Sequence, residues 1–226
     1  ATEDHDWAEV ASATFLGLAG LEKLALAEDP SPLAPVGCRR IGPEIESLFA
    51  AMGVGFPNER FAEWRRRLAG WWAPGARFGD AFAQQTVDLL GARSPLMLDS
   101  MLPELKVAER PHLARLIEAR AEVETAYRTA EERIVARGFD LQVAPQRGAS
   151  PLFLLRDGAR RRIEWSGDAG FRLRGAPGRE GAEPVGDLLA LLEGDSSLVS
   201  PGVLARPAIQ DAVLGTTLQI MGPGET

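Results

Sequence analysis

Apolar residues recur along the chain at two spacings, which predict an alternation of helices and short strands. Spacings of three and four residues place side chains on one face of a helix. They predict helices over residues 43–52, 57–72, 78–91, 103–137 and 185–192. Pro111 is expected to divide the longest of these, because proline is tolerated best near the start of a helix.

Short apolar or β-branched runs, bounded by glycine or proline, predict the strands. Gly17 and Gly20 favour a hairpin within residues 10–27, although the alanine, leucine and glutamate of this segment also favour a helix. The Asp157-Gly158 pair suits a tight turn between two strands. Strands are therefore expected at residues 36–41, 94–99, 141–145, 152–156, 161–165, 171–174 and 216–221.

The C-terminal stretch predicts a turn, a short helix, a strand and a glycine loop in succession. Pro207 suits the first turn of the helix, and Gly215 can end it in a left-handed conformation. The expected strand then leads into Gly222-Pro223-Gly224-Glu225. Open α/β sheets bind ligands at the carboxyl ends of their strands, so this loop is a candidate site. An ordinary helix and strand with a surface turn is the alternative.

Composition and charge narrow the class of protein. The chain has 226 residues, 45% of them apolar, so a sizeable core is available. Its net charge of −7 argues against binding to nucleic acid, which normally requires a basic face. The single cysteine, Cys38, excludes an internal disulfide framework and is compatible with the cytoplasm. No apolar run approaches the roughly 20 residues of a membrane span.

The N-terminus carries a dense group of titratable residues, Glu3-Asp4-His5-Asp6. Histidine titrates near neutral pH, so the group could supply general acid or base catalysis. Its carboxylates could also bind a cation. A solvated acidic terminus is the alternative. The distance in sequence from His5 to His112 does not match the spacing of zinc ligands, so no metal site is predicted.

Further candidates follow from their positions beside the expected elements. Arg206 comes just before a helical turn, where unpaired N–H groups favour an anion. Gln210 and Asp211 lie one turn further on. Asp99 and Ser100 follow an expected buried strand, and an acid at that place is a common site position in α/β sheets.

Both ends of the chain resemble the family of cysteine-adding enzymes of bacillithiol biosynthesis. The N-terminal matches are Glu3, Asp4, His5, Asp6, Trp7 and Glu9. The C-terminal matches are Ser200-Pro201, Val203-Leu204, Arg206-Pro207, Gln210-Asp211 and Gly222-Pro223-Gly224-Glu225. The chain departs from the family at Gly202, where asparagine is usual, and at Gly215, where proline is frequent.

The resemblance implies an α/β fold with a partial Rossmann-like, parallel-sheet core. Residues 1–10, 76–109 and 196–226 would form parts of this core. Residues 11–75 and 110–195 would be insertions that correspond to connecting segments of class I aminoacyl-tRNA-synthetase-like folds. Family members are more than twice as long and the first residue is not methionine, so the chain is expected to be an internal fragment. A homodimer of the full-length protein is a further possibility that the resemblance raises.

The activity that the resemblance implies is the joining of L-cysteine to glucosaminyl-malate through an amide bond. A carboxylate does not acylate an amine unaided, and by analogy ATP would activate it, although no complete nucleotide-binding loop occurs in the chain. Another amino-acid ligase or a nucleotidyl transferase on the same fold stays open, as does a non-catalytic binding or scaffold fragment.

The resemblance also implies roles for the candidate residues. His5 would stabilise developing negative charge or relay a proton, and Asp4 and Asp6 would orient it or hold the substrate ammonium group. Arg206 would pair with a carboxylate or a phosphate. The remaining substrate-binding candidates are Glu3, Asp99, Ser100, Gln210, Asp211, Gly222, Gly224 and Glu225.

Overall fold

The structure is a computed structural model that describes most of the chain. The described residues are 2–5, 7–17, 20–26, 31, 33–55, 59–141, 143, 146–167, 170–178 and 181–220. Contacts between residues divide the chain into two compact units, an N-terminal unit of Ala1–Met101 and a C-terminal unit of Leu102–Thr226. Each unit has its own cluster of buried apolar residues.

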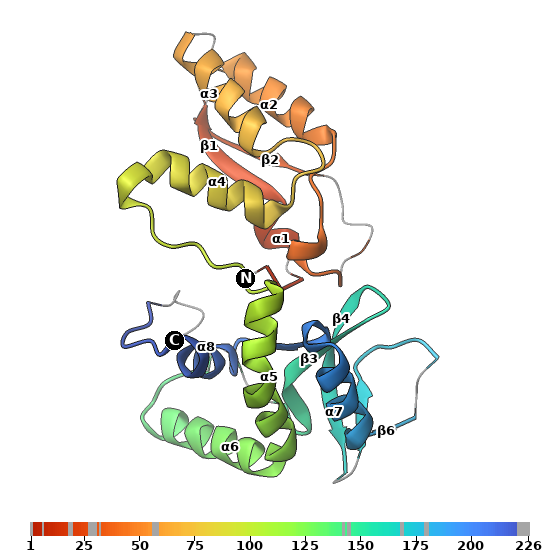
Figure 1. Cartoon of the computed structure of the whole chain (residues 1–226). Helices are drawn as coiled ribbons and strands as arrows, with labels where there is room; N and C mark the ends of the chain where they lie inside the picture. Colours follow the sequence, from red (N-terminus) through yellow and green to blue (C-terminus); the bar gives the residue numbers. More distant parts are fainter. Residues whose placement is uncertain are drawn as a thin grey trace. The chain divides into compact units, whose positions relative to one another are not determined.

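The N-terminal unit combines a β-hairpin with helices (Figure 1). In chain order its elements are α1 (Trp7–Val10), β1 (Ser12–Gly17), β2 (Gly20–Ala25), a 3₁₀ helix (Val36–Cys38), α2 (Glu44–Gly55), α3 (Glu59–Trp71), α4 (Phe78–Leu90) and a second 3₁₀ helix (Gly91–Arg93). Strands β1 and β2 pair antiparallel, with Ser12 opposite Ala25 and Gly17 opposite Gly20. Of the two alternatives that the sequence favours in this segment, the structure has the hairpin that Gly17 and Gly20 predict.

The core of the N-terminal unit forms where α2 and α4 meet the first 3₁₀ helix. Its buried residues are Val36, Ile41, Ile45, Phe49, Phe78 and Ala81. Two neighbouring indoles then join α3 to α4. Trp71 donates to the carboxylate of Asp88 at 2.6 Å, and Trp72 donates to Oε1 of Gln85 at 2.7 Å. Each ring can therefore be buried while its N–H keeps an acceptor.

The C-terminal unit is an antiparallel sheet with helices packed against it (Figure 1). Its elements are α5 (Pro103–Glu118), α6 (Arg120–Ala136), β3 (Ala149–Arg156), β4 (Ala159–Ser166), β5 (Gly170–Leu173), β6 (Glu183–Pro184), α7 (Val185–Gly194), a 3₁₀ helix (Ser196–Leu198), β7 (Val199–Pro201) and α8 (Arg206–Leu214). The strand order is β6-β5-β4-β3-β7, and each neighbouring pair is antiparallel.

The core of this unit forms on one face of the sheet. Leu152 and Leu154 alternate with less buried residues along β3, so both point to the same side. The helical residues buried with them are Leu113, Ile117, Val185, Leu188, Leu192 and Ile209. The turn between β3 and β4 has positive φ angles of 53° at Asp157 and 73° at Gly158, which confirms the predicted tight turn.

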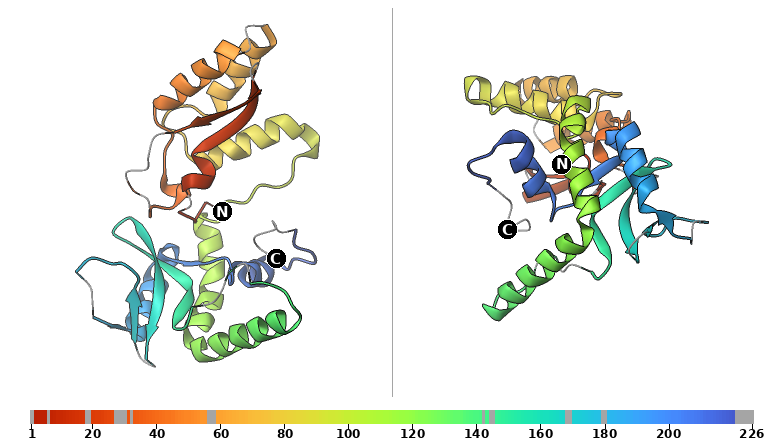
Figure 2. Two further views of the ribbon diagram at one scale, coloured as in Figure 1. Left: turned by 180° about the vertical axis from the view of Figure 1, so that it is seen from behind. Right: turned by 60° about the horizontal axis from the view of Figure 1, so that its bottom comes forward.

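Helix α5 runs through Pro111, so the prediction that this proline divides the helical region is wrong. The division falls at Ala119, whose φ and ψ are −90° and 25°, and α6 turns away from α5 there (Figure 2). Pro111 is exposed. Water can therefore hydrate the carbonyl group that the proline leaves without a helical hydrogen bond.

The strands predicted at 94–99 and 216–221 are also wrong where the structure describes them. Residues 94–99 and 216–220 belong to neither sheet, and Met221 lies outside the described residues. Leu96 and Ile220 are 96% and 93% exposed. An extended segment becomes a strand only when a neighbour takes up its backbone N–H and C=O groups. A parallel sheet containing these two segments was expected. In the described sheets, all neighbouring strands are antiparallel.

The predicted domain division stays a prediction. The predicted core combines residues from both compact units. The ranges concerned are 1–10, 76–109 and 196–226 for the core, and 11–75 and 110–195 for the insertions.

Candidate functional site

The N-terminal acidic segment is bonded through its backbone to the first 3₁₀ helix and is not an exposed free terminus. Glu3 is only 2% exposed, and Asp4 and His5 are partly buried. The carbonyl of Asp4 accepts a hydrogen bond from the Val36 N–H at 2.7 Å. The carbonyl of His5 accepts one from the Trp7 N–H at 2.8 Å. Asp6 lies outside the described residues.

The same contacts explain why the strand predicted at 36–41 does not form. The N–H of Val36 bonds to Asp4, and the N–H of Gly37 bonds to the carbonyl of Thr2 at 2.6 Å. These donors are unavailable for a β-ladder, and Val36–Cys38 closes as a 3₁₀ helix. Ile41 then bonds to Ala76 through its backbone, outside any strand.

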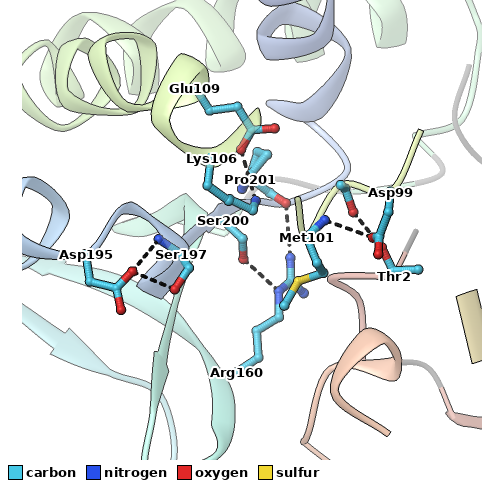
Figure 3. A network of polar contacts seen from close by, with 11 residues as sticks. Thr2, Asp99, Met101, Lys106, Glu109, Arg160, Asp195, Ser197, Ser200 and Pro201 are labelled. Atoms are coloured by element: carbon cyan, nitrogen blue, oxygen red, sulfur yellow. Dashed lines mark hydrogen bonds and ion pairs between the residues drawn. The ribbon is translucent and has the colours of Figure 1, made fainter. Parts of the chain in front are cut away.

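Asp99 and Ser100 lie beside this segment, and their contact with it runs through Thr2. The hydroxyl of Thr2 donates to Oδ1 of Asp99 and lies 2.9 Å from Oγ of Ser100. The N–H of Met101 also donates to Oδ1 of Asp99, at 2.9 Å. Arg77, the residue before α4, donates from Nη2 to Oδ2 of Asp99 at 2.5 Å. Figure 3 shows the bonds of Thr2 and Met101 to this carboxylate.

Two opposing effects set the pKa of Asp99. Partial burial raises it, whereas the hydrogen bonds from Thr2 and Met101 and the charge of Arg77 lower it. The lowering effects prevail, so the pKa lies below the ordinary value of 3.8. Asp99 is therefore a carboxylate at neutral pH.

An aromatic contact extends this corner beyond His5. The ring of Trp7 meets Phe78 of α4 edge to face at 5.5 Å, and the guanidinium of Arg39 lies 4.7 Å from the Trp7 ring centre. Arg39 is itself held by bonds from Nη2 to the carbonyls of Ser31 and Ala34, at 2.7 and 2.9 Å. The segment is thus fixed on both sides of His5.

The C-terminal candidates lie on α8 of the other unit. Arg206 begins this helix, and its N–H donates to the carbonyl of Gly202 at 2.9 Å. Gln210 is exposed on the same helix. Asp211 closes the end of the helix, because its carboxylate accepts from the Thr216 hydroxyl at 2.7 Å and its carbonyl from the Gly215 N–H at 2.8 Å.

Several local predictions for this stretch are confirmed. Pro207 lies in the first turn of α8. Gly215 ends the helix with φ 60° and ψ 45°, the left-handed conformation. Gly222, Gly224 and Glu225 of the glycine loop lie outside the described residues.

A buried arginine supports the turn that precedes α8. Arg160 of β4 is 3% exposed and donates to Oγ of Ser200 at 2.9 Å and to the carbonyl of Pro201 at 3.0 Å (Figure 3). Its guanidinium also lies 3.8 Å from the ring centre of Phe153. Lys106 and Glu109 of α5 form a second buried pair, with 2.9 Å between Nζ and Oε2.

The structure therefore gathers the candidates into two groups. The described residues Glu3, Asp4, His5, Asp99 and Ser100 belong to the N-terminal unit, and Arg206, Gln210 and Asp211 to the C-terminal unit. Sequence reasoning missed Thr2, Arg77 and Arg160. No signal in the sequence separates Arg160 from the adjacent Arg161 and Arg162, or links Thr2 to a residue 97 positions away.

A cavity of about 640 Å³ lies in the C-terminal unit, and none of the predicted site residues line it. Its walls include Tyr127 of α6 and Trp165 of β4. Burial raises the pKa of Tyr127. Among the described residues, no group of three or more His, Cys, Asp or Glu side chains could hold a metal ion. In the same part of the chain, no helix is long and apolar enough to cross a membrane.

These features define an α/β protein with a carboxylate- and histidine-bearing corner in one unit and a helix that begins at an arginine in the other. The whole chain, residues 1–226, matches the family model described as bacillithiol biosynthesis BshC, N-terminal Rossmann-like domain. The chain belongs to this family. The match confirms the Rossmann-like class and the resemblance stated from the two terminal motifs.

Relatives with curated descriptions are named provisionally as cysteine ligase BshC. The protein of Shouchella clausii is 28% identical over 227 residues, which cover 100% of this chain and 41% of the relative. That of Salinibacter ruber is 29% identical and covers 99% of this chain and 40% of the relative. That of Chlorobaculum tepidum is 30% identical, with 99% and 39% covered. The chain thus spans about two fifths of the length of these relatives.

Proposed function

We propose that this chain is part of a cysteine ligase that joins L-cysteine to glucosaminyl-malate in bacillithiol biosynthesis. The family match over residues 1–226 carries the proposal. The packing of Glu3, Asp4 and His5 beside Asp99 and Ser100 supports it, because a solvated terminus would not bury Glu3 to 2% exposure. Two groups of residues chosen by separate criteria thus belong to one corner of the N-terminal unit.

The chemistry requires an acyl transfer. The carboxyl carbon of cysteine forms a bond to the sugar amine, and one carboxyl oxygen departs. The attacking amine must lose a proton, and a neutral imidazole can accept it. His5 is proposed as this base, or as the group that stabilises negative charge on the carbonyl oxygen. Asp4 and Asp6 would orient its ring or hold the ammonium group of cysteine.

The N-terminal corner and Arg206 carry opposite charges, so they would bind different groups of the substrates. The carboxylates of Glu3 and Asp4 would favour an ammonium group over a phosphate, whereas the carboxylate of Asp99 is already paired with Arg77. Arg206 carries the charge that suits a carboxylate or a phosphate, and the first turn of α8 favours an anion. Glu225, Gln210 and the glycines of the C-terminal loop would contact polar substrate groups.

ATP belongs to the proposal as the reagent that makes the carboxyl oxygen a good leaving group. Arg206 fits a phosphate by charge, and the acidic corner does not. The cytoplasm as location, and a homodimer of the full-length protein, belong to the same proposal and are tested by cell fractionation and by light scattering.

The deciding experiment is mass spectrometry of the full-length protein incubated with L-cysteine and glucosaminyl-malate, with and without ATP. A product at the mass of the joined thiol, formed only with ATP, is expected. His5→Ala should abolish its formation while leaving the thermal midpoint unchanged. A folded full-length protein that makes no product under either condition would overturn the proposal.

A further inference from the structure

Contacts from three separate parts of the N-terminal unit meet at Thr2. The Thr2 carbonyl accepts from the N–H of Gly37 at 2.6 Å. Its hydroxyl donates to Asp99 and lies 2.9 Å from Ser100 Oγ. Its methyl group faces Gly79, where an added Cβ would come within 2.9 Å of Cγ2. A Cβ at Gly37 would lie 3.0 Å from the Cβ and the carbonyl oxygen of Thr2. Two glycines therefore allow the close approach on either side.

Both oxygens of the Asp99 carboxylate are engaged by protein donors. Oδ1 accepts from the Thr2 hydroxyl and the Met101 N–H, and Oδ2 accepts from Arg77 at 2.5 Å. Arg77 comes directly before α4, so its position follows from the packing of that helix. The side chain of Asp99 is 20% exposed, which leaves little of it open to a substrate.

We infer that Asp99 is a positioning residue rather than a substrate contact, and that with Arg77 it holds Thr2 and thereby the segment Glu3–His5. The four residues Thr2, Arg77, Asp99 and Ser100 are called the Thr2 clamp below. The geometry of the clamp is independent of the proposed function. Its catalytic consequence rests on that function.

The segment needs such a clamp because it has no regular secondary structure of its own. Thr2 and Glu3 form a turn, and Asp4 and His5 belong to neither a helix nor a strand. Backbone hydrogen bonds reach it at the carbonyls of Thr2, Asp4 and His5. Such a segment opens locally at low cost unless side chains restrain it. Misplacing a catalytic group by about 1 Å can lower the rate about a hundredfold.

The test uses variants of the full-length protein that differ by one polar group. Thr2→Val removes the hydroxyl and keeps the methyl group against Gly79, whereas Thr2→Ser keeps the hydroxyl. Thr86→Val is the matched control, because the Thr86 hydroxyl donates to a backbone carbonyl within α4, that of Phe82 at 2.8 Å. All three variants are compared with the wild type in two assays.

The first assay is hydrogen exchange followed by mass spectrometry. Thr2→Val is expected to speed exchange of the Val36 and Gly37 amides, whose acceptors are Asp4 and Thr2. A lost bond to a charged group corresponds to about a tenfold or greater increase in rate. Thr2→Ser should stay within about threefold of the wild type, since the donor is kept. If the Val36 and Gly37 amides exchange no faster in Thr2→Val than in Thr86→Val, the proposed role of the Thr2 clamp is overturned.

The second assay is the formation of the cysteine adduct. Thr2→Val should lower kcat about tenfold with KM changed less than about twofold, because the segment is misplaced while substrate contacts remain. Faster exchange with unchanged kcat would overturn the positioning role, and loss of kcat in Thr2→Ser would assign the effect to the methyl group instead. If the wild-type protein forms no adduct, the proposed function fails, and hydrogen exchange alone decides the clamp.

Discussion

Gly202 offers a test of the packing beside the C-terminal motif, because the resemblance implies asparagine as the usual residue of the family at this position. Its N–H donates to the Pro151 carbonyl at 2.7 Å. A Cβ added at this position would lie 2.8 Å from Cε2 of Phe153 and 3.0 Å from the carbonyl oxygen of Pro151. Real Cβ atoms essentially never come within 3.0 Å of another atom, so the contact with Phe153 is too close, and the contact with Pro151 is tighter than most. The ring of Phe153 therefore occupies the space that an asparagine side chain would need.

The expected effect of Gly202→Asn is a loss of stability of about 1–3 kcal/mol, the usual range for overpacking a filled site. Replacing glycine also restricts the unfolded chain, which offsets about 0.4–1 kcal/mol of this loss. The backbone oxygen of Pro151 cannot move freely, because it belongs to β3 and accepts from Gly202. Phe153 is the neighbour that can give way.

The assay is a double-mutant cycle measured by urea unfolding of the full-length protein. Phe153→Leu removes the ring and also the contact that Arg160 makes with it at 3.8 Å. It should destabilise on its own, yet leave room for asparagine. The double variant should then be less destabilised than the sum of the single variants, with a coupling energy of about 1 kcal/mol or more.

The control for Gly202→Asn is Gly186→Asn in α7, where an added Cβ meets nothing within 4 Å. That change should stay within about 0.5 kcal/mol of the wild type. A Gly202→Asn protein as stable as the wild type, or additive effects of the two substitutions, would refute the argument that Phe153 replaces the asparagine of the family.

Three further predictions concern the charged residues. Because the pKa of folded Asp99 lies below 3.8, its stabilising effect is present above that pH and is lost as the pH falls through the folded pKa, so Asp99→Asn should weaken the acid dependence of the urea midpoint. Arg160→Met should lower the unfolding free energy by about 1–3 kcal/mol, because Ser200 Oγ and the Pro201 carbonyl lose a buried donor. His5→Ala should abolish adduct formation with an unchanged thermal midpoint, and normal turnover would remove His5 from the mechanism.

The elements that the sequence predicts correctly have signals within a few residues of each other. The Asp157-Gly158 turn sets the β3–β4 hairpin, and Pro207 and Gly215 mark the start and end of α8. The extended segments at 94–99 and 216–220 carry an equally strong local signal for strands. A ladder also needs a partner, and local composition does not specify one. Among the described residues neither segment has such a partner.

The candidate site likewise contains residues that the sequence reveals and residues that only the fold reveals. The acidic segment can be selected from the sequence for its density of titratable groups. Asp99 can be selected as an acid that follows an expected strand, although residues 94–99 join neither described sheet. The residues that fix them are ordinary by composition. Thr2 gains its role from Asp99 and Ser100, about a hundred positions away, and Arg160 gains its own from Ser200, 40 positions away. Only the fold distinguishes Arg160, 3% exposed, from its neighbours in the Arg160-Arg161-Arg162 run.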